Sequence, residues 1–285
     1  LGGGPTVYAT DEMAQGAMGL GGMPRNDAVA IMMQMGGGLM GDDEVPPPLW
    51  SSMSALAMFN GLVSAGTPGA ERSPAVFERS LLAALNDRTD GAIGSNLDAM
   101  ARTAGVLRDR IAPEQWGLVR RMGDEWQAHF DHVGAVLPTT AQAVPALQRL
   151  ALQLAAVTGT QTDRMTRDHG WRLLSVGRLV ERMAGLSQAM QHLIGVIDGR
   201  GGSAVATSLL LDLFDSGITF RARYQRHEDL LALVDLLVLD DINPRSFAGT
   251  LRRLRTEIGK LPGTLSWRDE MLALWPERGA GLPPL

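Results

Sequence analysis

The chain has 285 residues, of which 45% are apolar, a formal net charge of −5 and no cysteine. The apolar content suffices for a sizeable core, while the lack of cysteine excludes disulfides, thiolate metal sites and a cysteine nucleophile. The acidic balance argues against a nucleic-acid-binding protein held by bulk electrostatics. No apolar run approaches the ~20 residues of a membrane span and no signal peptide is visible, so we expect a cytoplasmic protein that does not contact a membrane.

Residues 1–49 differ in kind from the rest of the chain. They carry 11 glycines and end in three consecutive prolines, a composition that predicts no helix of useful length. We interpret 1–49 as a loosely attached segment and 50–285 as the main domain. The GGGLMG stretch (36–41) lacks the Lys-Ser/Thr ending of a phosphate-binding loop, so we expect no cofactor and no specific nucleotide binding by this chain.

Helical patterns begin at Ser73, and strand patterns are absent after residue 50, which predicts an all-α multi-helix bundle. Ser73 caps the first of these helices and Pro74 takes its first position, where the missing N–H costs nothing. Further helices are expected to start at Ser95, with a capping box, at Pro113, and at Thr139 or Thr140, the last of these ending at Gly159. After the long helix described below, helices are expected over Ala204–Arg226 and His227–Asp240. Asn243 is expected to cap another helix, and a short one is expected near Trp267–Leu274.

One long helix, within Asp163–Gly199, is predicted to be the centre of the bundle. Thr166 is its expected N-cap, and Gly199 can take the left-handed conformation that ends a helix. About 32 residues at ~1.5 Å each give a rod of roughly 48 Å. The predicted buried stripe consists of Val176, Val180, Met183, Ser187, Met190, Ile194 and Ile197.

The run GRLVER (177–182) is the densest polar group on this helix. Arg178, Glu181 and Arg182 share one helix surface because they are three and four residues apart. They form either a solvated ion-pair face, which would contribute little, or an inward cluster that binds an anion or holds neighbouring helices in register. Gly177 favours the second interpretation, since a mid-helix glycine costs ~1 kcal/mol relative to alanine unless something packs close to it.

Further arginines follow polar turns elsewhere in the chain. Each of these groups is either a basic helix face or part of a site. If they converge with GRLVER they would line one anion-binding cleft, whose candidate residues are Arg167, Arg178, Glu181, Arg182, Asp215, Arg221, Arg223, Tyr224, Asn243 and Arg245. We expect Glu181 to be partly buried and bonded to Arg221 or Arg223. His129 and His132 lack a third nearby ligand, so no metal site is predicted.

Three stretches, MTRDHGWRLLSVGRLVER (165–182), FDSGITFRARYQ (214–225) and LLVLDDINPRSFAGTLRRL (236–254), together resemble the bacterial alpha-E domain. The resemblance extends over about residues 75–260 and implies an all-helical module whose own activity is not established. The family is often fused to, or encoded beside, a circularly permuted ATP-grasp protein, a presumed ATP-dependent amide or peptide ligase. Residues 1–45 resemble the tail of such a protein. Family members usually begin with a helix carrying a WLGRYxERAE-like run, which residues 48–78 do not supply.

Two hypotheses about function remain open. The first is a non-catalytic accessory or interaction module of an ATP-grasp-type amide ligase system. The second is an enzyme, or half of one, in peptide or amide-bond modification, with an arginine-rich anion-binding cleft. Because no nucleophile–base pair is visible in the sequence, no catalytic residue is assigned. The discriminating observation is whether the arginine groups gather in space.

Overall fold

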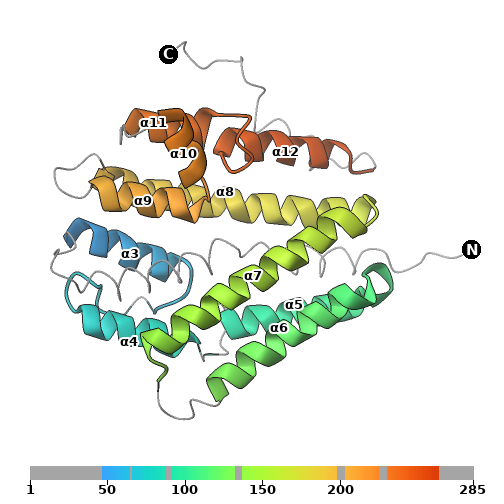
Figure 1. Cartoon of the computed structure of the whole chain (residues 1–285), viewed down its shortest axis with the longest axis horizontal. Helices are drawn as coiled ribbons and strands as arrows, with labels where there is room; N and C mark the ends of the chain where they lie inside the picture. The colour runs from blue at the N-terminus through green and yellow to red at the C-terminus, as the bar shows by residue number, and fades with distance from the viewer. Residues whose placement is uncertain are drawn as a thin grey trace, which may run out of the picture.

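The computed structural model describes residues 47–262, apart from 65, 86, 88–91, 132–136, 198–202 and 225–229. These described residues form helices and no strand, which confirms the all-α bundle. The elements, with the labels used in Figure 1, are α3 (Pro47–Phe59), α4 (Pro74–Leu85), α5 (Ile93–Val106), η1 (Arg108–Arg110), α6 (Pro113–Asp131), α7 (Thr140–Arg164), α8 (His169–Ile197), α9 (Ser203–Leu213), α10 (Gly217–Tyr224), α11 (Leu230–Val234), the π-helical turn η2 (Asp235–Leu239) and α12 (Phe247–Gly259).

Helix α8 lies at the centre of the bundle, as predicted, and contacts α3, α9 and α12. Figure 1 shows α10, α11 and α12 on one side of it, α3 to α6 on the other, and α7 crossing diagonally between the two ends of the molecule. None of the described helices is long and apolar enough to cross a membrane.

Two hydrophobic cores bury different halves of α8. The carboxyl-terminal half, including Leu186 and Leu193, belongs to the large core shared by α3 to α11. The amino-terminal half contributes Leu179 and Met183 to a small core with α12. The predicted stripe is partly wrong: Met183, Met190 and Ile197 are buried, but Val180 is 37% exposed, because the buried side of the helix includes Leu179, Leu186 and Leu193 in place of the position of Val180.

Helix α3 corrects the expectation for residues 1–49. Its first turn contains Pro47 and Pro48, which a helix tolerates only at its start. Leu49 is completely buried, and Ser52 donates a 2.6 Å hydrogen bond to the backbone oxygen of His192 on α8. The end of that segment is thus part of the core. Residues 1–46, and with them the glycine-rich stretch, lie outside the described residues.

Several predicted boundaries also change. Helix α4 has its expected bounds, but α7 continues past Gly159 to Arg164. The expected capping box at Ser95 is absent, since the Ser95 hydroxyl donates to the Ala92 carbonyl inside the first turn of α5. The helix expected over 204–226 divides at Asp215, whose φ of 46° breaks it into α9 and α10. The helix expected near 267–274 lies outside the described residues.

The start of α8 was also misplaced. Asp168, rather than Thr166, precedes the helix, and its Oδ1 accepts the backbone N–H of Trp171 at 3.0 Å. A carboxylate at this position satisfies a free N–H of the first turn and suits the helix dipole. Asp168 also pairs with Arg110, so one side chain both caps α8 and ties it to the loop before α6.

Candidate functional site: the α8–α12 arginine cluster

The small core holds α8 and α12 side by side. Leu179 and Met183 of α8 pack with Leu254 and Ile258 of α12, and Arg172 of α8 pairs with Glu257 of α12 at 2.6 Å. Polar residues flanking these apolar contacts are consequently brought from two distant parts of the sequence to the same face.

The loop before α12 is fixed by buried polar groups. Ser246 is the N-cap, because its Oγ accepts the Gly249 N–H at 2.9 Å. Asn243, predicted to be the cap, is instead buried and donates from Nδ2 to the Leu236 carbonyl of η2 at 3.1 Å. A Cβ on Gly249 would lie 2.2 Å from the Asn243 backbone oxygen, so only glycine permits this approach. Together these contacts fix the backbone position of Arg245 in this loop.

Four arginines on this face lie near enough for their charges to affect one another. Arg178 and Arg182, one turn apart on α8, are both partly buried. Burial and the neighbouring charge of Arg253 lower the pKa of Arg178. Burial, followed by the charges of Arg245, Arg253 and Arg178, lowers the pKa of Arg182 to about 10. We call Arg178, Arg182, Arg245 and Arg253 the arginine cluster.

The polar contacts of Arg178 and Arg245 differ in kind. Arg178 donates to the neutral Oε1 of Gln161 on α7 at 3.2 Å. Arg245 pairs with Asp215 at 3.3 Å, but that carboxylate is 78% exposed, so the pair lies at the solvent edge, where ion pairs contribute little. Arg178, Arg182 and Arg245 are half-buried and Arg253 is exposed, so part of the positive charge of the cluster is withdrawn from water.

The remaining predicted residues are held in separate pairs. Arg223 pairs with Asp240, and the Tyr224 hydroxyl donates to Asp235. The positive charge of Arg221 lies close enough to Asp212 to act against the increase in that carboxyl's pKa caused by burial.

Arg167 stacks over Trp171, 5.4 Å from the ring centroid, outside the cluster. Glu181 is partly buried as predicted, and its bond to Arg221 or Arg223 stays a prediction. The predicted cleft thus divides into the arginine cluster and an ion-paired region around α10 and η2.

Sequence comparison relates this arrangement to known proteins. Residues 24–275 match the profile of a family named Alpha-E, described as a predicted alpha-helical domain with a conserved ER motif. The chain belongs to the Alpha-E family. Uncharacterised proteins of Mycobacterium bovis and of two Mycobacterium tuberculosis strains are each 20% identical over 225 residues, covering 78% of this chain and 26% of theirs. The chain therefore spans about a quarter of the length of these relatives. No solved structure matches.

The Glu-Arg pair of this Alpha-E chain that lies on the central helix is Glu181-Arg182. Arg182 is the member of the arginine cluster whose pKa the other three arginines all lower. Sequence reasoning had selected Arg178, Arg182 and Arg245 but missed Arg253. Helical spacing gave no signal for it, because Arg245 precedes the N-cap Ser246 and lies outside α12. The described residues contain no group of three acidic or histidine side chains placed to hold a metal.

Proposed function

We propose that this chain is a non-catalytic helical accessory module of an ATP-grasp-type amide ligase system, and that its arginine cluster binds an anionic group of the ligand. The observation that carries the proposal is the convergence of Arg178, Arg182, Arg245 and Arg253 from α8 and the α12 region. Had these arginines been dispersed over the surface, they would be ordinary solvated side chains.

The chemistry of the cluster favours a carboxylate or phosphate. Guanidinium groups present N–H donors in a fixed planar fork that matches two oxygens of either anion. An anion at this position would offset the repulsion that Arg182 experiences from Arg245, Arg253 and Arg178. It would also take up donors of Arg178 and Arg182 that are partly withdrawn from water, where charge-assisted hydrogen bonds are stronger.

The partner follows from the family resemblance. ATP-dependent amide bond formation handles carboxylate substrates and acyl-phosphate intermediates, both of which carry the anionic groups that the cluster suits. We therefore propose a circularly permuted ATP-grasp protein or domain as the partner. In this scheme the helical chain holds the substrate while the ligase supplies nucleotide chemistry, which agrees with the lack of a phosphate-loop motif in the sequence.

Calorimetric titration with inorganic phosphate and with glutaryl-glycine, a small dicarboxylate, tests anion binding. Saturable binding that weakens at least about tenfold in Arg182→Met supports the proposal, because one charge-assisted hydrogen bond contributes on the order of 1.5–3 kcal/mol. Arg120→Met is the matched control, since Arg120 is exposed on α6. Equal binding by all three proteins, or none by the wild type, contradicts the proposed role of the cluster.

The partner is tested separately by co-purification. The host's circularly permuted ATP-grasp protein, produced with an affinity tag, should retain this chain on a column, and an unrelated ATP-grasp ligase should not. Failure to retain the chain would refute the proposed partner while leaving the anion site to be judged by titration.

A further inference from the structure

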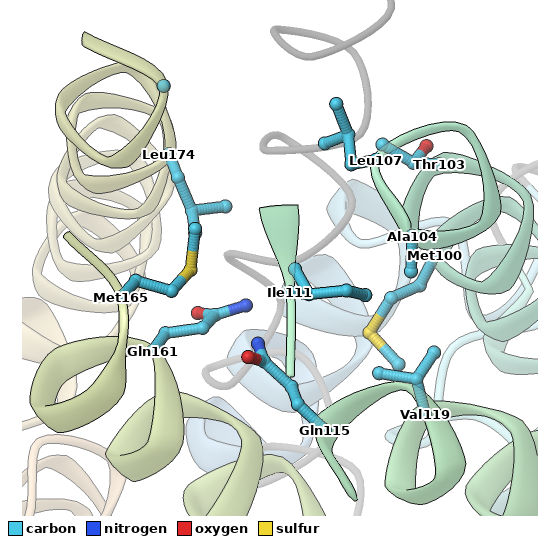
Figure 2. A pocket seen from close by; sticks show the side chains of 11 residues that line it. Met100, Thr103, Ala104, Leu107, Ile111, Gln115, Val119, Gln161, Met165 and Leu174 are labelled. Carbon is cyan, nitrogen blue, oxygen red and sulfur yellow. The ribbon is translucent and has the colours of Figure 1, made fainter. Parts of the chain in front are cut away.

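A small apolar pocket lies between α5, α6 and the junction of α7 with α8, and Figure 2 shows it from close by. Its volume is about 50 Å³. The apolar part of its wall comes mainly from Met100, Leu107, Ile111, Val119, Met165 and Leu174. A space of this size holds roughly three to four non-hydrogen atoms, since one water needs about 10–15 Å³ on this scale.

Two glutamines interrupt the apolar wall. Gln115 of α6 is 3% exposed, and its Oε1 has no hydrogen-bond partner among the described residues. A buried, unpartnered polar atom costs about 1–3 kcal/mol. Figure 2 shows the amide groups of Gln115 and Gln161 directed toward one another across the pocket, but no hydrogen bond joins these two described side chains.

The hydrogen bond from Arg178 sets the orientation of the Gln161 amide. Gln161, 5% exposed on α7, has Arg178 on one side, and Arg178 can only donate. The atom facing Arg178 must therefore be Oε1, which leaves Nε2 as a donor on the pocket side (Figure 2). The Gln161 backbone oxygen also accepts from the Trp171 indole at 3.0 Å, which fixes this part of α7 against α8.

The pocket thus offers one unpaired acceptor, Gln115 Oε1, and one donor, Gln161 Nε2, within an apolar wall. An amide presents the complementary pair, an N–H donor and a carbonyl acceptor, in one flat group. We propose that this pocket binds the carboxamide end of a small ligand or of a side chain, with the amide bridging Gln115 and Gln161 and a short aliphatic stem against Met100 and Leu174. The inference stands apart from the proposed anion site.

Methyl NMR spectra of the protein labelled at methionine methyl groups test the proposal, because Met100 and Met165 line the pocket. Acetamide is the probe, because it has four non-hydrogen atoms, and acetate and acetone are the matched compounds, of which the first brings a charge and the second lacks a donor. We expect saturable shifts of the Met100 and Met165 signals with acetamide, and binding at least about tenfold weaker for both matched compounds.

Gln115→Leu supplies the second arm. It removes the unpaired acceptor and leaves an apolar side chain, a change that is nearly neutral or stabilising for folding; a melting temperature at or above that of the wild type confirms that the variant is folded. Its affinity for acetamide should fall at least about tenfold, while Gln191→Leu, at an exposed position of α8, should leave it unchanged. Equal shifts with all three compounds, unaltered affinity in Gln115→Leu, or no shift in the wild type would each overturn the proposal.

Discussion

Replacing Arg182 by methionine should raise the free energy of unfolding at pH 7 in a buffer without phosphate or sulfate. Methionine keeps an apolar stem of comparable reach and removes the charge. Burial and the charges of Arg245, Arg253 and Arg178 lower the pKa of Arg182 to about 10, so the folded protein holds this proton less tightly than the unfolded chain does. The protonated side chain consequently destabilises the fold.

The magnitude follows from that decrease. Each pKa unit corresponds to about 1.4 kcal/mol, so the lowered pKa limits the destabilisation by Arg182 to about 3 kcal/mol. Because Arg182 is only partly buried and solvent screens the repulsion, we expect a gain of about 1–2 kcal/mol. The pH dependence follows from the same lowered pKa: the destabilisation by Arg182 is complete below about pH 10 and is lost as the pH rises above that value. Above about pH 10 the free energy of unfolding of the wild type should therefore increase with pH, and that of Arg182→Met should lack this increase.

Urea melts of the wild type, Arg182→Met and the control Arg120→Met provide the measurement, with equal m-values showing that the unfolded states are comparable. The control should change by less than about 0.5 kcal/mol. Added phosphate should stabilise the wild type and have a smaller effect on Arg182→Met. If the free energy of unfolding of Arg182→Met falls by more than about 1 kcal/mol and phosphate stabilises the variant as much as the wild type, the conclusion that Arg182 destabilises the fold and binds anions is refuted.

Three further changes test the fold. Leu49→Ala should cost about 2–5 kcal/mol in denaturant melts, because the side chain is completely buried in a segment expected from sequence to be loose; a cost below 1 kcal/mol would contradict the placement of α3. Gly249→Ala should cost about 2–4 kcal/mol through overpacking and loss of the α12 cap, whereas Gly159→Ala, with open space around its Cβ position, should gain up to about 1 kcal/mol; equal effects would refute the close approach. Glu257→Gln should cost about 1–2 kcal/mol, and a double-mutant cycle with Arg172 should show coupling; additivity would show that the pair contributes nothing.

Local signals predicted much of the helical architecture. The pair Ser73-Pro74 predicted the start of α4, because a capping residue followed by proline is typical of a helix start. The prolines at 46–48 were interpreted as a break, although Leu49, Met53, Leu56 and Ala57 already had helical spacing. Thr166 and Asn243 were both plausible caps, yet the chain uses Asp168 and Ser246. The choice depended on tertiary partners, Arg110 for the first and η2 for the second, which no local pattern encodes.

The site was predictable only in part, for a related reason. Residue type and spacing identified Arg178, Arg182 and Arg245 as candidates, but convergence depends on how α12 lies against α8. Arg221 and Arg223 had the same sequence character and are instead held near carboxylates of other elements. The glutamine pocket gave no sequence signal, because a buried glutamine resembles a surface one until its neighbours are placed.

The arginine cluster lies beside the smaller of the two cores, and that placement bears on its purpose. Leu179, Met183, Leu254 and Ile258 hold α8 and α12 together despite the repulsion between their arginines. A structural requirement would be met better by alternating charges, as in the Arg172–Glu257 pair on the same two helices. Residues that stabilise the fold less well than an available alternative are expected at functional sites. The contrast between Arg172, which pairs with Glu257, and Arg178, which donates to the neutral Gln161, therefore supports binding, rather than scaffolding, as the reason for the cluster.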